Sequence, residues 1–167
     1  QNPQIHIVLN PKFEREKLLE QLKKFDFSFE ALDSDGVLIH NPTGLFDTDL
    51  YRTGSFLVQD VSAQLINTII EPISKKRVLD ACASPGGKLF NLEWSYGKEI
   101  EKLTGIEISR SRFQRLLGNK KRYKSGAEII CQDVFALEEG QDQFDCVLID
   151  APCSATGTIR KHPEIKW

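Results

Sequence analysis

Two segments of the chain combine residue types that could bind a cofactor and act on a substrate. The first is Asp80-Ala-Cys-Ala-Ser-Pro-Gly-Gly-Lys88, and the second is Asp150-Ala-Pro-Cys-Ser-Ala-Thr-Gly157. Glycines let the backbone approach a ligand closely, and a helix that begins behind them offers unpaired N–H groups. Carboxylates and cysteine thiolates can act as bases and nucleophiles. Both segments follow short apolar runs, so we expect each at the end of a strand.

The glycine segment differs from the common phosphate-binding motifs. A P-loop needs glycine at the position of Cys82 and Ser or Thr at the position of Leu89. The dinucleotide fingerprint G-x-G-x-x-G is missing as well. A phosphate ligand is therefore not favoured, and the alternative to a cofactor site is a plain strand-to-helix turn.

Acidic residues end the next two expected strands. Glu107 could accept two ribose hydroxyls, as acids at this position do in dinucleotide-binding folds. Asp133 could accept from an adenine amino group, with Val134 or Phe135 packing on the ring. A helix cap or a solvated carboxylate is the alternative for Asp133.

The four cysteines fall into two groups. Cys131 and Cys146 lie within apolar runs, and we expect both to be buried strand residues. Cys82 and Cys153 lie in loops directly after strands. No pair has a zinc-ligand spacing, so no metal site is expected.

The pattern of apolar residues predicts alternating strands and helices, with Ser109 as a helix N-cap. The expected strands are 5–9, 27–32, 37–40, 77–81, 103–108, 127–131 and 144–149, and the expected helices are 13–25, 60–71, 86–98 and 109–123. Residues 43–60 read as loop. Alternation after residue 72 predicts an α/β fold, a parallel sheet with helices on both faces.

We expect three parts: a small α+β auxiliary domain over 1–45, a linker and helix over 46–71, and the main α/β domain over 72–167. The chain has 167 residues, of which 40% are hydrophobic and 28% charged, and no apolar stretch is long enough for a membrane span. The cytoplasm is the default location.

The formal net charge of −2 argues against bulk electrostatic binding of nucleic acid. Local basic runs at 110–124 and 160–166 could form patches, and the alternative is solvated charge.

Segments 80–88 and 150–157 together resemble the Sun/Fmu-type RNA cytosine-5 methyltransferases, and residues 54–60 resemble the segment before the cofactor domain of that family. The resemblance covers roughly residues 50 to 167. It implies a Rossmann-like fold that binds S-adenosylmethionine, truncated here after the fourth strand. The family often has Asp where Glu107 stands and Thr where Leu89 stands.

The resemblance also implies a role for each motif residue. Glu107 would bind the ribose, Asp133 the adenine, and Asp150 would lie beside the transferred methyl and the target base. The expected cofactor-binding set is Cys82, Ala83, Ser84, Pro85, Gly86, Gly87, Lys88, Glu107, Arg112, Asp133 and Asp150. Arg160 and Lys161 are the expected RNA contacts.

The chemistry explains the residue types. Carbon-5 of cytosine is a poor nucleophile until a thiolate adds to carbon-6, after which carbon-5 can take a methyl group and a base removes its proton. The family's nucleophile lies in a later motif, so we expect it beyond Trp167. Cys153 and Asp150 form the expected catalytic set, with Cys153 assisting release of the RNA adduct. Cytosine DNA methyltransferases attack from a Pro-Cys motif, so Cys153 as nucleophile stays open.

The expected substrate is ribosomal RNA, with transfer RNA as the alternative. Truncation would expose an apolar edge of the fourth strand, so we expect the chain either to be part of a longer protein or to associate in a way that covers that edge. We also expect it to be inactive alone. A non-catalytic module that binds S-adenosylmethionine or RNA is the competing function. Ala151-Pro152-Cys153 disfavours an amino-group methylase, which usually has Pro-Pro-aromatic there.

Overall fold

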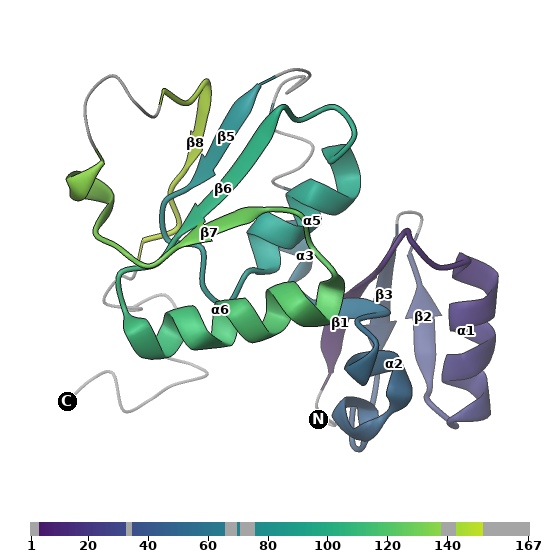
Figure 1. The fold of residues 1–167 in the computed structure, drawn as a ribbon. Coiled ribbons are helices and arrows are strands. Elements are labelled where there is room, and N and C mark those ends of the chain that lie inside the picture. The colour runs from purple at the N-terminus through teal and green to yellow at the C-terminus, as the bar shows by residue number, and fades with distance from the viewer. Residues whose placement is uncertain (1–3, 33–34, 66–69, 71–75, 138–142, 152–167) are drawn as a thin grey trace.

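The computed structural model describes residues 4–32, 35–65, 70, 76–137 and 143–151, and these form two four-stranded sheets (Figure 1). The first sheet has the order β2-β3-β1-β4, with β1 (Ile5–Leu9), β2 (Phe29–Ala31), β3 (Gly36–Ile39) and β4 (Phe56–Val58). The second has the order β7-β6-β5-β8, with β5 (Arg77–Asp80), β6 (Lys102–Ile106), β7 (Glu128–Ile130) and β8 (Cys146–Leu148).

The first sheet is antiparallel throughout and packs on α1 (Arg15–Lys24). Leu18 and Leu22, one helical turn apart, are buried against Ile7, Val37 and Ile39. The predicted strand, helix and hairpin of this region are confirmed.

The prediction of loop over residues 43–60 is wrong. This segment contains the 3-10 helix η1 (Leu45–Asp47), helix α2 (Asp49–Arg52) capped by Thr48, and β4, which pairs with β1. A three-residue strand is too short to show an alternating pattern, and pairing with β1 decides its conformation. Because β4 completes the first sheet, we propose that the first unit extends to residue 58 instead of ending at 45.

The second sheet is parallel, and its strands appear along the sheet in the sequence order three, two, one, four. This confirms the predicted α/β fold class. Helices α5 (Gly87–Tyr96) and α6 (Arg110–Tyr123) confirm two predicted helices, and Ser109 caps α6 through the Arg112 N–H. Helix α3 (Val61–Gln64) confirms the start of the helix predicted over 60–71, most of whose remainder lies outside the described residues.

Helices cover one face of the described part of this sheet. Val78 and Leu103 pack there on α5 and α6. On the other face, Leu79 and Ile106 pack against the segment that includes the 3-10 helix η2 (Val134–Ala136). The prediction of helices on both faces is therefore met on one face only in the part of the chain that the structure describes. There, too, no helix is long and apolar enough to span a membrane.

The prediction that Cys131 and Cys146 are buried fails at the outer strands of the sheet. Cys131, expected to be buried, is exposed just past β7, and Cys146 on β8 is half-buried. Both follow or lie on strands that have a neighbour on one side only among the described residues. Val147 and Ile149 of the β8 segment are also largely exposed, as expected for an apolar outer strand.

The two units share one interface. Val8 and Leu57 belong to the core of the second sheet, and the Asn91 side-chain amide donates to the Gln59 side-chain oxygen at 2.6 Å. The C-terminal end of α6 meets the first unit (Figure 1), where Gly54 has a φ of +72°. A Cβ at Gly54 would lie 2.4 Å from the Arg122 carbonyl oxygen.

We expect Gly54→Ala to lower the free energy of unfolding by about 3–4 kcal/mol, because it adds a backbone clash to left-handed strain. The matched control is Gly44→Ala. Gly44 also has a positive φ, of +81°, but a Cβ there meets nothing within 4 Å. The control should therefore lose only about 1–2 kcal/mol. Urea unfolding measures both, and equal losses would contradict the close approach.

Candidate functional site

The turn after β5 requires glycine for a steric reason. Gly86 has a φ of +104°, and a Cβ there would lie 2.1 Å from the Phe90 ring. Helix α5 begins at Gly87, directly behind it. The motif predicted to approach a ligand therefore has the conformation that its glycines permit.

Helix α6 holds this turn in place. The Ser84 hydroxyl donates to the Arg112 carbonyl at 2.8 Å, and the Arg112 guanidinium donates back to the Ser84 carbonyl at 3.1 Å. The Asn119 amide donates to the Pro85 carbonyl at 2.7 Å. Gly105 of β6 allows the turn to pack closely on this strand, because a Cβ at Gly105 would lie 2.9 Å from the Cβ of Ala83.

Glu107 ends up as a buried, oriented carboxylate. Its side chain is 3% exposed in the ion pair with Arg112, whose Nε lies 3.3 Å from Oε2. Its Oε1 accepts from the Ser109 N–H at 2.9 Å. These contacts stabilise the charge and fix the direction of the carboxylate. Arg112 therefore orients two predicted site elements, Glu107 and the glycine turn.

Two cavities open at this end of the sheet. The first has a volume of about 170 Å³ and the second about 90 Å³. Cys82 lines both, so they adjoin. The first is lined by Val58, Gln59, Ala63, Asp80, Cys82, Ala83, Ser84, Pro85, Gly87, Lys88 and Asp150. The second is lined by Ala81, Cys82, Glu107, Ile108, Arg112, Gln132, Asp133 and Val134.

The structure thus brings the predicted residues together at one edge of the sheet. Of the predicted cofactor-binding set, only Gly86 lines neither cavity; its role is to shape the turn. Lys88, in the first turn of α5, and Asp150, just past β8, form an ion pair across the first cavity. Cys153, Arg160 and Lys161 lie outside the described residues.

Asp133 caps η2 and still faces the second cavity. Its carboxylate accepts from the Phe135 N–H at 3.0 Å, so the helix-cap alternative is confirmed. Phe135 is 93% exposed and does not line the cavity, whereas Val134 does. Of the two residues expected to pack on a ring, Val134 alone is placed to do so.

Sequence reasoning missed several lining residues. Val58, Gln59 and Ala63 come from segments before the second sheet. The resemblance of residues 54–60 to the family is a signal for Val58 and Gln59, and the sequence gives none for Ala63. Asp80 was quoted within the glycine motif but was not assigned to the site. Ile108 follows β6 and is exposed in the second cavity.

The buried carboxylate of Asp80 has an unusual pKa. Burial raises the pKa of Asp80 from 3.8 to about 6; the Cys82 N–H and Lys88 lower it, and the charges of Asp150 and Glu107 raise it further. Burial likewise raises the pKa of the Cys82 thiol, with Asp80 and Glu107 adding to the shift. Cys82 is therefore a neutral thiol near pH 7.

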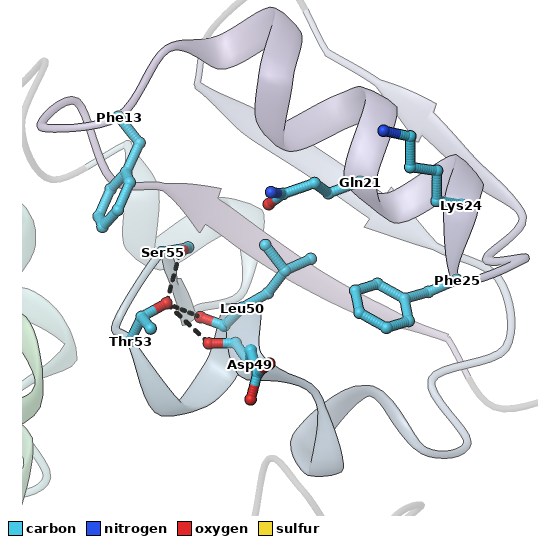
Figure 2. Close-up of a pocket in the computed structure, with 8 residues that line it drawn as sticks. All are labelled: Phe13, Gln21, Lys24, Phe25, Asp49, Leu50, Thr53 and Ser55. Carbon is cyan, nitrogen blue, oxygen red and sulfur yellow. Dashed lines mark hydrogen bonds between the residues drawn. The ribbon is translucent and has the colours of Figure 1, made fainter.

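A larger cavity, of about 450 Å³, lies elsewhere, between α1 and α2 of the first unit (Figure 2). It is flanked by Phe13 and Phe25, and its hydroxyls are used within the fold: Thr53 Oγ1 donates to the Asp49 carbonyl at 2.7 Å and lies 2.9 Å from the Ser55 hydroxyl. None of the predicted site residues that the structure describes lines it.

A parallel sheet of this strand order, with a glycine turn after the first strand and an acid after the second, defines the Rossmann-like fold of the S-adenosylmethionine-dependent methyltransferases. Residues 67–167 match the family model described as 16S rRNA methyltransferase RsmB/F. The chain belongs to this family.

Curated relatives carry the name ribosomal RNA small subunit methyltransferase B. The protein of Shewanella oneidensis is 38% identical over 159 residues, covering 92% of this chain and 36% of the relative. That of Vibrio vulnificus is 35% identical, covering 92% and 37%. The chain therefore spans a little over a third of the length of these relatives.

Solved structures share the fold. A methyltransferase homologue from Pyrococcus horikoshii has a TM-score of 0.79 at 23% identity, covering 96% of this chain and 53% of that one. NSun6 from Pyrococcus horikoshii with SFG has a TM-score of 0.81 at 16% identity, covering 92% and 64%.

The pKa of Asp80 gives a test of the site electrostatics. Because its pKa is raised in the folded state, the stability that Asp80 contributes is complete below pH 3.8 and is lost as the pH rises through about 6. Asp80→Asn carries no charge. We therefore expect the unfolding free energy of this variant to rise relative to that of the wild type by about 2 kcal/mol between pH 4 and 7. Urea unfolding across this range measures the difference. An Asp80→Asn curve that runs parallel to the wild type would contradict the buried charge.

Proposed function

We propose that this chain is the cofactor-binding part of a longer enzyme that transfers a methyl group from S-adenosylmethionine to carbon-5 of a cytosine in ribosomal RNA. The observation that carries the proposal is the pair of adjoining cavities that meet at Cys82, one flanked by the glycine turn and the other by buried Glu107. An elongated ligand with an amino-acid end and a nucleoside end matches this division.

The first cavity suits the amino-acid end of the cofactor. Asp80 and Asp150 can accept from an ammonium group, while Lys88 and the N–H groups at the start of α5 can hold a carboxylate. A positive charge here would also stabilise the ionised form of Asp80, which burial makes costly. When bound, S-adenosylmethionine supplies an electrophilic methyl group.

The second cavity suits the nucleoside end. Glu107 is held with its carboxylate oriented, so it can accept two ribose hydroxyls without reorganisation. Asp133 can accept from the adenine amino group, and Val134 and Ile108 offer apolar surface for the ring. Because Arg112 already pairs with Glu107, its contribution to binding is to position that carboxylate.

The reacting base would lie beside Asp150. Cys82 is unsuited to attack carbon-6, because burial and two nearby carboxylates keep its thiol protonated. This supports placing the nucleophile in a later segment of the longer protein, with Cys153 assisting release of the RNA from its covalent adduct. Arg160 and Lys161, in the same segment as Cys153, are proposed to contact RNA, and the cytoplasm is the proposed location.

Glu107→Gln tests the ribose assignment. We expect the full-length protein carrying this change to bind S-adenosylmethionine about 10-fold or more weakly, since a charge-assisted hydrogen bond is replaced by a neutral one. Isothermal titration calorimetry measures the affinity. The matched control is Glu101→Gln, a change at the opposite end of β6, which should bind like the wild type. Equal affinities for the two variants would remove the ribose assignment.

Cys153→Ala tests whether Cys153 assists release of the RNA or itself attacks the cytosine. In the full-length enzyme incubated with ribosomal RNA and S-adenosylmethionine, we expect a covalent RNA–protein adduct to accumulate, because release is impaired while attack is not. Denaturing gels detect the adduct, and bisulfite sequencing of the RNA detects 5-methylcytosine. Loss of methylation with no adduct would make Cys153 the nucleophile instead.

A further inference from the structure

A fourth hollow, here called the junction cleft, lies between the first unit and helices α5 and α6. It has a volume of about 330 Å³ and shares Val58, Pro85 and Gly87 with the first cavity, so it opens beside the methyl-donor site. Its side walls are aromatic and cationic, formed by Phe46, Tyr51, Arg115, Asn119, Arg122 and Tyr123. No carboxylate lines it within the described residues.

Arg122 places an uncompensated positive charge at this cleft. Its guanidinium carbon lies 3.9 Å from the Tyr51 ring centre and 4.7 Å from that of Tyr123, and it donates to the Asn119 side chain and the Tyr123 hydroxyl. The other terminal nitrogen, Nη1, is buried and has no hydrogen-bond partner in the described part of the chain. A cation held without a carboxylate is costly, and a nearby anion offsets that cost.

Arg115 adds an accessible charge on the same side of α6. It lies seven residues before Arg122, which is about two helical turns or about 10 Å. Its side chain is exposed, and none of the ion pairs among the described residues involves it. Phe46, 46% exposed, offers an aromatic face at the same cleft.

We propose that the junction cleft binds the RNA strand next to the target nucleotide, with a phosphate against Arg115, in the positive potential of Arg122, and a base stacked on Phe46. The inference rests on the proposed function. Aromatic stacking and cationic side chains together are the features that hold single-stranded RNA. A target base must also be unstacked to reach the methyl donor, which brings its neighbouring backbone to this side of the first cavity.

The test uses the full-length protein and a fluorescein-labelled single-stranded RNA decamer with one cytosine, followed by fluorescence anisotropy at several salt concentrations. We expect Arg115→Gln to weaken binding about 5- to 10-fold at low salt and to reduce the slope of log affinity against log salt by about 0.7, the value for one phosphate contact in a single strand. Phe46→Ala should weaken binding about 5- to 10-fold and leave the slope unchanged, because stacking releases no counterions.

Lys98→Gln is the matched control, because it removes an exposed positive charge just past α5 and outside the cleft. If Arg115→Gln binds the RNA as this control does, the inference is wrong. It is also wrong if poly-glutamate displaces the RNA at equal phosphate and carboxylate concentrations, since the cleft would then be an acidic-peptide site. Calorimetry with S-adenosylmethionine separates the two proposals. Variants at Arg115 and Phe46 that keep the wild-type affinity for the cofactor but bind RNA more weakly support the cleft. A wild-type protein that binds no cofactor overturns the proposed function itself.

Discussion

The hydrogen bonds between α6 and the glycine turn are the contacts on which the whole site depends. Arg112 is bound on one side to the Ser84 carbonyl and on the other to Glu107, so a single side chain sets the distance between the two cavities. Asn119, further along the same helix, holds the Pro85 carbonyl and the Arg122 guanidinium. A shift of α6 would therefore move the glycine turn, Glu107 and the junction cleft together.

Charge is divided between neighbouring hollows. Asp80, Asp150 and Glu107 make the first and second cavities acidic, and the raised pKa of Asp80 reflects its burial first and the neighbouring carboxylates second. The junction cleft, separated from them by the turn, carries two arginines. An acidic region suits the cationic methyl donor, and a basic region suits a phosphate backbone. This separation would let the enzyme bind two ligands of opposite charge side by side without either occupying the site of the other.

The first unit is joined to the site through β4. Phe56 points into the core of the first sheet, and Leu57, next along the strand, packs in the core of the second. Val58 and Gln59 then reach the first cavity. The interface thus places the first unit where it lines both the first cavity and the junction cleft.

The sequence alone determined the strand-and-helix order of the second unit, the glycine turn and the acids at strand ends, because these depend on local periodicity and on residues with few conformational alternatives. It could not predict that Cys131 is exposed, that Arg112 pairs with Glu107, or that residues 56–58 join the first sheet. Each of these depends on which strand lies at an edge or which helix crosses a turn, contacts between residues far apart in the chain. The residue types of the site were therefore readable from the sequence, whereas their shared cavities and charges were decided by tertiary packing.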